Sequence, residues 1–207
     1  MSSAGTSEAI QDMRAPPSLG MWVFIASELL FFGALLAAYL AARVHCPAGF
    51  ASASRHTHVV LGTANTAILL TSSALIALAV ACDRHPLHRR WTSRLLWMVA
   101  GLRCAFIAVK GCEYVLEWQE GLFPGPGFPL TQPGAQLFFA LYFFTSGLHA
   151  VHLICGIAAV ATFACATAAA RAWAKPERLE AVALYWHFVD VVWIFLYPLL
   201  YLVERHA

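Results

Sequence analysis

Five long apolar stretches dominate the sequence, and each is long enough to form a helix that crosses a bilayer. A spanning helix requires roughly 20 mostly apolar residues. The stretches cover about residues 19–42, 59–82, 95–117, 136–167 and 181–203. Only 12% of the 207 residues are charged, whereas soluble proteins carry roughly a quarter. The sequence therefore predicts an all-α fold, a polytopic membrane bundle of five transmembrane helices.

The remaining residues leave no room for a second domain. Residues 1–18 are polar and lack the basic start of a signal peptide, so they predict a cytoplasmic N-terminal tail. Residues 19–207 predict a single five-helix transmembrane domain. A net charge of +2 gives no indication of a nucleic-acid partner. The six cysteines show no C-x-x-C spacing, and we expect small buried apolar residues rather than disulfides or metal ligands.

Basic residues alternate between the connections, and this alternation predicts the orientation. The second and fourth connections hold Arg84, Arg89, Arg90, Arg94, Arg171, Lys175 and Arg178. The third connection, residues 118–135, contains neither Lys nor Arg, and its Pro and Gly content excludes a helix or strand. Because short cytoplasmic connections are enriched in Lys and Arg, the N-terminus is predicted in the cytoplasm and the C-terminus in the periplasm.

The third stretch carries charged residues at helical spacing. Arg103, Lys110 and Glu113 fall on one stripe, together with Phe106, Tyr114 and Glu117. Because an unpaired charge facing hydrocarbon is costly, we expect this stripe to face protein. Lys110 and Glu113 are three residues apart, which favours an ion pair within the helix.

Five further ionisable residues lie inside the first, fourth and fifth stretches. They are Glu28, His149, His152, His187 and Asp190. His149 and His152 fall near mid-membrane, and counted from the cytoplasmic side His187 and Asp190 enter at a depth comparable to that of Glu28. The five residues therefore predict a polar cluster that joins three helices. Two roles stay open for Glu28: a structural carboxyl with a partner on another helix, or proton handling.

The same five residues are also a set of possible metal ligands. Inward-facing Glu and His residues hold metals in carboxylate-bridged helix bundles. Those bundles use Glu-x-x-His pairs, and this chain has none in its apolar stretches. We therefore predict no metal site on this chain.

Five blocks of sequence resemble one family. They are MWVFIASELLFFGALLAAYL at 21–40, LGTANTAILLTSS at 61–73, KGCEYVLEWQEGLFPGP at 110–126, QLFFALYFFTSGLHAVHLICG at 136–156 and YWHFVDVVWIFLYPLLYL at 185–202. Together they resemble subunit III of the haem-copper oxidases, the cytochrome c oxidase branch especially. Long members of that family have two further N-terminal helices, so this chain resembles the short, five-helix bacterial form.

The resemblance implies a non-catalytic subunit of an oxidoreductase complex, with no redox centre of its own. Haem and copper would lie in the main partner, subunit I, whose proton uptake and binuclear centre this chain would support during turnover. Glu28 corresponds to the family's carbodiimide-reactive carboxyl. The family's other membrane-embedded polar positions correspond to His149, His152, His187 and Asp190. Subunit II, other oxidase subunits and phospholipid are the further partners implied, in a bacterial inner membrane.

Two other interpretations remain at this point. A quinol oxidase subunit III, or the subunit-III-like protein associated with nitric oxide reductase, has a related sequence. An autonomous membrane metalloenzyme or proton carrier is a different class, in which the five ionisable residues would do the chemistry themselves.

Overall fold

The computed structural model describes residues 17–83 and 89–202. Most of the predicted N-terminal tail and Arg84 lie outside these ranges. The described residues form six α-helices and one short π-helix, and no strand. In chain order these are α2 (Pro17–His45), α3 (Pro47–Ser54), α4 (Val59–Asp83), α5 (Arg89–Gln119), α6 (Ala135–Ala168), α7 (Pro176–Tyr197) and the π-helix η2 (Pro198–Leu202).

Five of the described helices are long and apolar enough to cross a membrane, namely α2, α4, α5, α6 and α7 with η2. Even α7, with 22 residues, is about 33 Å long, enough for a hydrocarbon core of about 30 Å. These helices confirm the predicted five-helix membrane bundle. Helix α5 begins at Arg89, so Arg90 and Arg94 lie on its first turns and not in a loop as expected.

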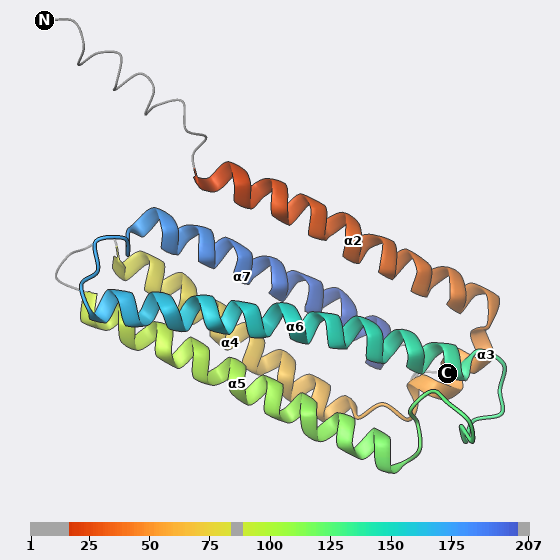
Figure 1. Ribbon diagram of the computed structural model, residues 1–207. Helices are drawn as coiled ribbons and strands as arrows, with labels where there is room; N and C mark the ends of the chain where they lie inside the picture. The colour runs from red at the N-terminus through yellow and green to blue at the C-terminus, as the bar shows by residue number, and fades with distance from the viewer. Residues whose placement is uncertain (1–16, 84–88, 203–207) are drawn as a thin grey trace, which may run out of the picture.

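Four of the spanning helices pack closely, and α2 lies along one side of them against α7 and α6 (Figure 1). Helices α2, α5 and α7 begin at one end of the bundle, where α6 also ends. At the other end lie α3, η2 and the connection between α5 and α6. The first and last described residues are therefore at opposite ends, as an odd number of spans requires.

The connection between α2 and α4 contains the helix α3, which the sequence pattern did not predict. Phe50 and Ala53 of this helix are buried, and α3 packs against α6. The two backbones approach so closely that a Cβ atom on Gly49 would overlap the carbonyl oxygen of Pro133. The connection between α5 and α6 contains neither helix nor strand, as predicted from its Pro and Gly content.

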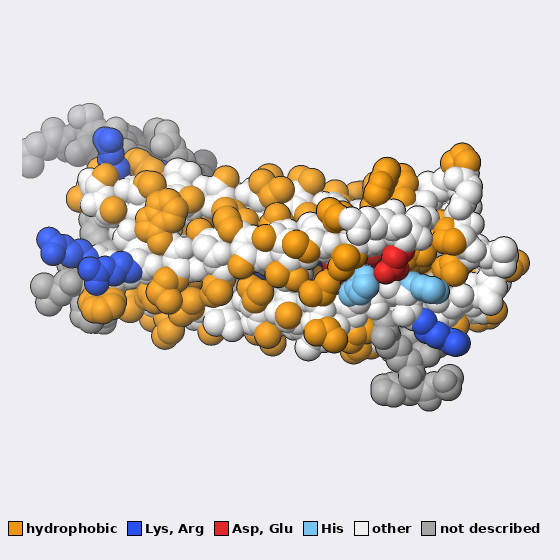
Figure 2. All heavy atoms as spheres, turned by 90° about the horizontal axis from the view of Figure 1, so that it is seen from below, with side chains coloured by type: hydrophobic (Ala, Val, Ile, Leu, Met, Phe, Trp, Pro, Cys, Tyr) orange, Lys and Arg blue, Asp and Glu red, His pale blue; other side chains and the backbone are white. Residues whose placement is uncertain are grey.

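Apolar side chains cover most of the bundle's length on the face shown in Figure 2, and Lys and Arg gather toward its ends. Cys104, Cys112, Cys155 and Cys165 are exposed on the bundle, so the expectation that they are buried was wrong. In a bilayer the outside of a bundle faces hydrocarbon, and a small apolar side chain has little reason to prefer the inside.

Candidate functional site

The charged stripe of α5 points into the bundle. The exposed fractions of Arg103, Lys110 and Glu113 are 0%, 3% and 0%. Residues at these spacings share one face of a helix, and this face is turned toward α6, α7 and η2. Because all three charges lie on the face of α5 that is turned inward, they lie inside the bundle and not toward hydrocarbon.

Arg103 forms an ion pair with Asp190 that joins α5 to α7. One guanidinium nitrogen donates to the Asp190 carboxylate, and the guanidinium carbon lies 4.8 Å from the ring centroid of Trp186. Trp186 in turn packs against Gly156 of α6, where a Cβ atom would lie 3.1 Å from the indole ring. The pair is thus enclosed by helices on several sides.

Lys110 is the centre of a second buried network. Its ammonium group lies 3.1 Å from a Glu113 carboxylate oxygen and donates to the hydroxyls of Tyr142 and Tyr201 at 2.6 Å each. Tyr142 also donates to the other Glu113 oxygen at 3.0 Å. The expected pair within the helix is present, and the two tyrosines connect it to α6 and η2.

Glu28 and His152 form a third contact, between α2 and α6. The distance from His152 Nε2 to a Glu28 oxygen is 3.1 Å, and His152 Nδ1 lies 2.9 Å from the carbonyl oxygen of Leu148. A carbonyl only accepts, so Nδ1 carries the hydrogen of this bond. One ring nitrogen of His152 therefore binds its own helix, and the other contacts Glu28 of α2.

The other two histidines have different neighbours. His187 Nδ1 lies 2.9 Å from the hydroxyl oxygen of Ser73 on α4. His149 is buried, neither ring nitrogen has a hydrogen-bond partner among the described residues, and its ring lies beside those of Phe106 and Trp193.

The direct contacts thus divide the five residues of the expected cluster among separate helix pairs. The physical reason is the helix geometry. Residues three apart point in directions about 60° apart, so His152 reaches α2 while His149 points between α5 and α7. In the same way His187 reaches α4 while Asp190 reaches α5.

Several residues of these networks were missed from the sequence as site residues. They are Ser73, Tyr142, Trp186, Trp193 and Tyr201. Trp193 donates its indole N–H to Thr66 at 3.1 Å, and the two tyrosines bind Lys110. For Tyr142, Tyr201 and Trp193 a chemical signal was available: a tyrosine or tryptophan inside a spanning helix usually finds a partner for its O–H or N–H when it is buried.

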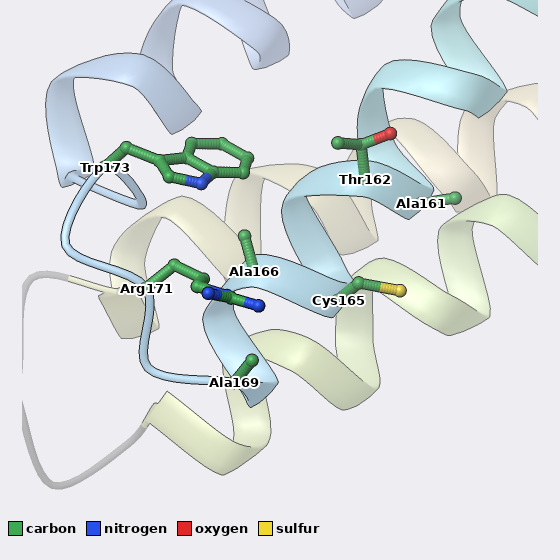
Figure 3. Close-up of a pocket in the computed structure, with 7 residues that line it drawn as sticks. All are labelled: Ala161, Thr162, Cys165, Ala166, Ala169, Arg171 and Trp173. Atoms are coloured by element: carbon green, nitrogen blue, oxygen red, sulfur yellow. The ribbon is translucent and has the colours of Figure 1, made fainter.

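The structure gives no grouping of three or more His, Cys, Asp or Glu side chains suited to a metal within residues 17–83 and 89–202. An open groove of about 570 Å³ lies at the end of α6. There Arg171 and Trp173, from the connection to α7, extend toward Ala166 (Figure 3). No predicted site residue lines this groove.

Comparison with known proteins gives consistent matches over most of the chain. Residues 9–204 match the family model described as "Cytochrome c oxidase subunit III". The "Probable cytochrome c oxidase subunit 3" of Nocardia farcinica is 30% identical, over 90% of this chain and 88% of that protein. The "Cytochrome c oxidase subunit 3" of Thermostichus vulcanus is 29% identical, over 98% and 96%. The "Heme-copper oxidase subunit I+III" of Aeropyrum pernix is 31% identical, over 88% of this chain and 22% of that protein.

Proposed function

The chain belongs to the cytochrome c oxidase subunit III family, and on that premise we propose that it packs against subunit I of a respiratory haem-copper oxidase in a bacterial inner membrane. It is a multi-pass membrane protein with five spanning helices. In this proposal the haem and copper belong to subunit I, and this chain contributes packing and proton handling rather than a redox centre.

One observation supports the proposed binding to subunit I. The relative from Aeropyrum pernix is named as subunits I and III together, and this chain matches 22% of its length. In that protein the part similar to this chain belongs to the same polypeptide as a subunit I part. The two parts are therefore made together there, and we propose that the separate chain binds an equivalent subunit I.

Copurification tests the partnership. The chain is tagged, extracted from membranes in mild detergent and purified, and a visible spectrum is recorded with mass spectrometry of the bound proteins and lipids. We expect subunit I and its haem bands, and we expect subunit II and phospholipid in the same preparation. A chain that purifies alone, with metal, colour or transport activity of its own, would instead support an autonomous metalloenzyme or proton carrier.

The proposed role of Glu28 rests on its contact with His152. The carboxylate and the imidazole lie 3.1 Å apart, between α2 and α6. Both side chains are only partly buried, with exposed fractions of 20% and 14%, so the pair lies near the surface of the bundle. We propose that it assists proton uptake and the endurance of the oxidase during turnover.

Glu28→Gln tests this role. The glutamine amide retains the volume and the hydrogen bond to His152 but cannot take up or release a proton. We expect oxygen reduction to begin near the wild-type rate, with a loss well below the 10²–10⁴-fold typical of a missing acid–base group. Activity should then decay faster over repeated turnovers, or the proton yield should fall.

The measurement is oxygen consumption and proton release by the purified complex, with Glu177→Gln as the control because Glu177 is exposed. Immediate and complete loss of activity in a normally assembled complex would favour a direct catalytic role. Unchanged endurance and proton yield would return Glu28 to a structural role.

We also propose that the N-terminus is cytoplasmic, from the basic second and fourth connections. A cysteine introduced at Gly125, in the connection between α5 and α6, should react with a membrane-impermeant maleimide in cells with an intact inner membrane. Wild-type protein, labelled in the same way, gives the background reaction of the native cysteines. If the cysteine is labelled only after the inner membrane is permeabilised, residue 125 is cytoplasmic and the orientation is the opposite of the one proposed.

A further inference from the structure

Glu117 is a buried acid that none of the three contacts above includes. It lies one helical turn beyond Glu113 on the same face of α5, and its exposed fraction is 0%. Neither carboxyl oxygen has a hydrogen-bond partner among the described residues. Lys110 and Glu113 lie close enough to interact with it electrostatically, and the Tyr142 hydroxyl, which donates to Glu113, lies nearby.

The neighbouring hydrogen-bond donors are already used. An ammonium group has three N–H donors, and those of Lys110 are directed at Glu113, Tyr142 and Tyr201. The single O–H of Tyr142 is directed at Glu113. Tyr114 is bound to Ser146, whose own hydroxyl donates to a backbone carbonyl. Tyr201, which accepts from Lys110, has its own O–H beside the Tyr142 hydroxyl at 3.3 Å. The donors of these described side chains are thus directed at groups other than the Glu117 carboxyl.

The charges of Lys110, Glu113 and Glu117 also indicate that Glu117 is not ionised. Lys110 contributes one positive charge, and Glu113 and Glu117 would contribute two negative charges if both were ionised. Glu113 already balances Lys110: one carboxylate oxygen accepts from the ammonium group, and the other accepts from the Tyr142 hydroxyl. A buried charge without a partner is avoided by neutralisation, so the second carboxyl group must hold a proton.

We infer that Glu117 is a proton-binding site, and that the Lys110–Glu113–Glu117 group is neutral because it holds exactly one exchangeable carboxyl proton. Glu120, the residue after the end of α5, is exposed, and its carboxylate lies 3.8 Å from His58. Glu113 and Glu117 lie one turn apart on the buried face of α5, and the exposed Glu120 follows at the end of the helix. The inference concerns this chain alone and does not depend on the identity of its partner.

Infrared difference spectroscopy counts protonated carboxyl groups, because the C=O stretch of a carboxylic acid is separate from carboxylate and amide bands. Wild type and variants are extracted from membranes with whatever subunits they retain, and each variant spectrum is subtracted from the wild-type spectrum so that other carboxyls cancel. Glu117→Gln should remove one carboxylic acid band, and Glu120→Gln, the matched control, should remove none.

The neighbouring variants test the charge count. Glu113→Gln should also remove the band, because Glu117 then ionises to balance Lys110. Lys110→Met should double it, because both carboxyls then hold protons. Glu117→Gln is neutral and similar in size, so the test stands even where the other two variants do not fold. An unchanged carboxylic acid band in Glu117→Gln would show that Glu117 is ionised and would overturn the inference, whatever the copurification experiment finds.

Discussion

Replacing Asp190 with alanine is expected to destabilise the folded protein by about 3–5 kcal/mol, because the change leaves Arg103 buried without its counter-charge. Arg103 has an exposed fraction of 0%, and Asp190 is its ion-pair partner from the facing helix. The measurement is the free energy of unfolding in mixed micelles with increasing denaturing detergent. Val191→Ala is the matched control, since Val191 is the next residue of α7 and is exposed.

The double variant Arg103→Leu with Asp190→Leu distinguishes the effect of the unbalanced charge from the effect of lost side-chain packing. Replacing a whole buried ion pair by apolar residues of similar volume is often neutral or stabilising. We therefore expect the double variant to recover most of the stability that Asp190→Ala loses. A double variant as unstable as the single one, or an Asp190→Ala variant as stable as wild type, would contradict the assignment of this pair.

Trp193→Ala is expected to cost a similar amount, about 3–5 kcal/mol, as is typical for removal of a buried aromatic side chain. Trp193 is 1% exposed, and its ring centroid lies 4.9 Å from that of Phe106 and 5.1 Å from that of His149. It also lies within 5.9 Å of the Lys110 ammonium group. Its removal would therefore leave a cavity beside both the buried histidine and the Lys110 network.

Trp193→Phe is the control that separates volume from hydrogen bonding. It retains an aromatic ring but loses the indole N–H that binds Thr66, so we expect a smaller loss of about 1 kcal/mol, the usual value of one hydrogen bond, plus the cost of the smaller ring. Both variants are measured by the same unfolding assay as Asp190→Ala. Equal stabilities of Trp193→Ala and wild type would show that this side chain does not support the core.

The spans could be predicted from the sequence because the bilayer imposes one physical rule on every stretch: backbone groups must be satisfied within a helix, and the helix must be apolar. The same rule indicated that Arg103, Lys110 and Glu113 face protein, since a charge in hydrocarbon is costly. Even the Lys110–Glu113 contact followed from spacing along one helix. The helix α3 was missed, because its docking depends on the close approach of Gly49 to the start of α6.

Only the tertiary structure decided which residues of different helices meet. Spacing along a helix gives the relative directions of two side chains, but not the rotation of that helix about its axis or the identity of its neighbour. For this reason depth in the membrane suggested one cluster, whereas packing pairs Glu28 with His152 and Asp190 with Arg103. The family membership follows from sequence alone, while these pairings depend on contacts between residues more than 80 positions apart.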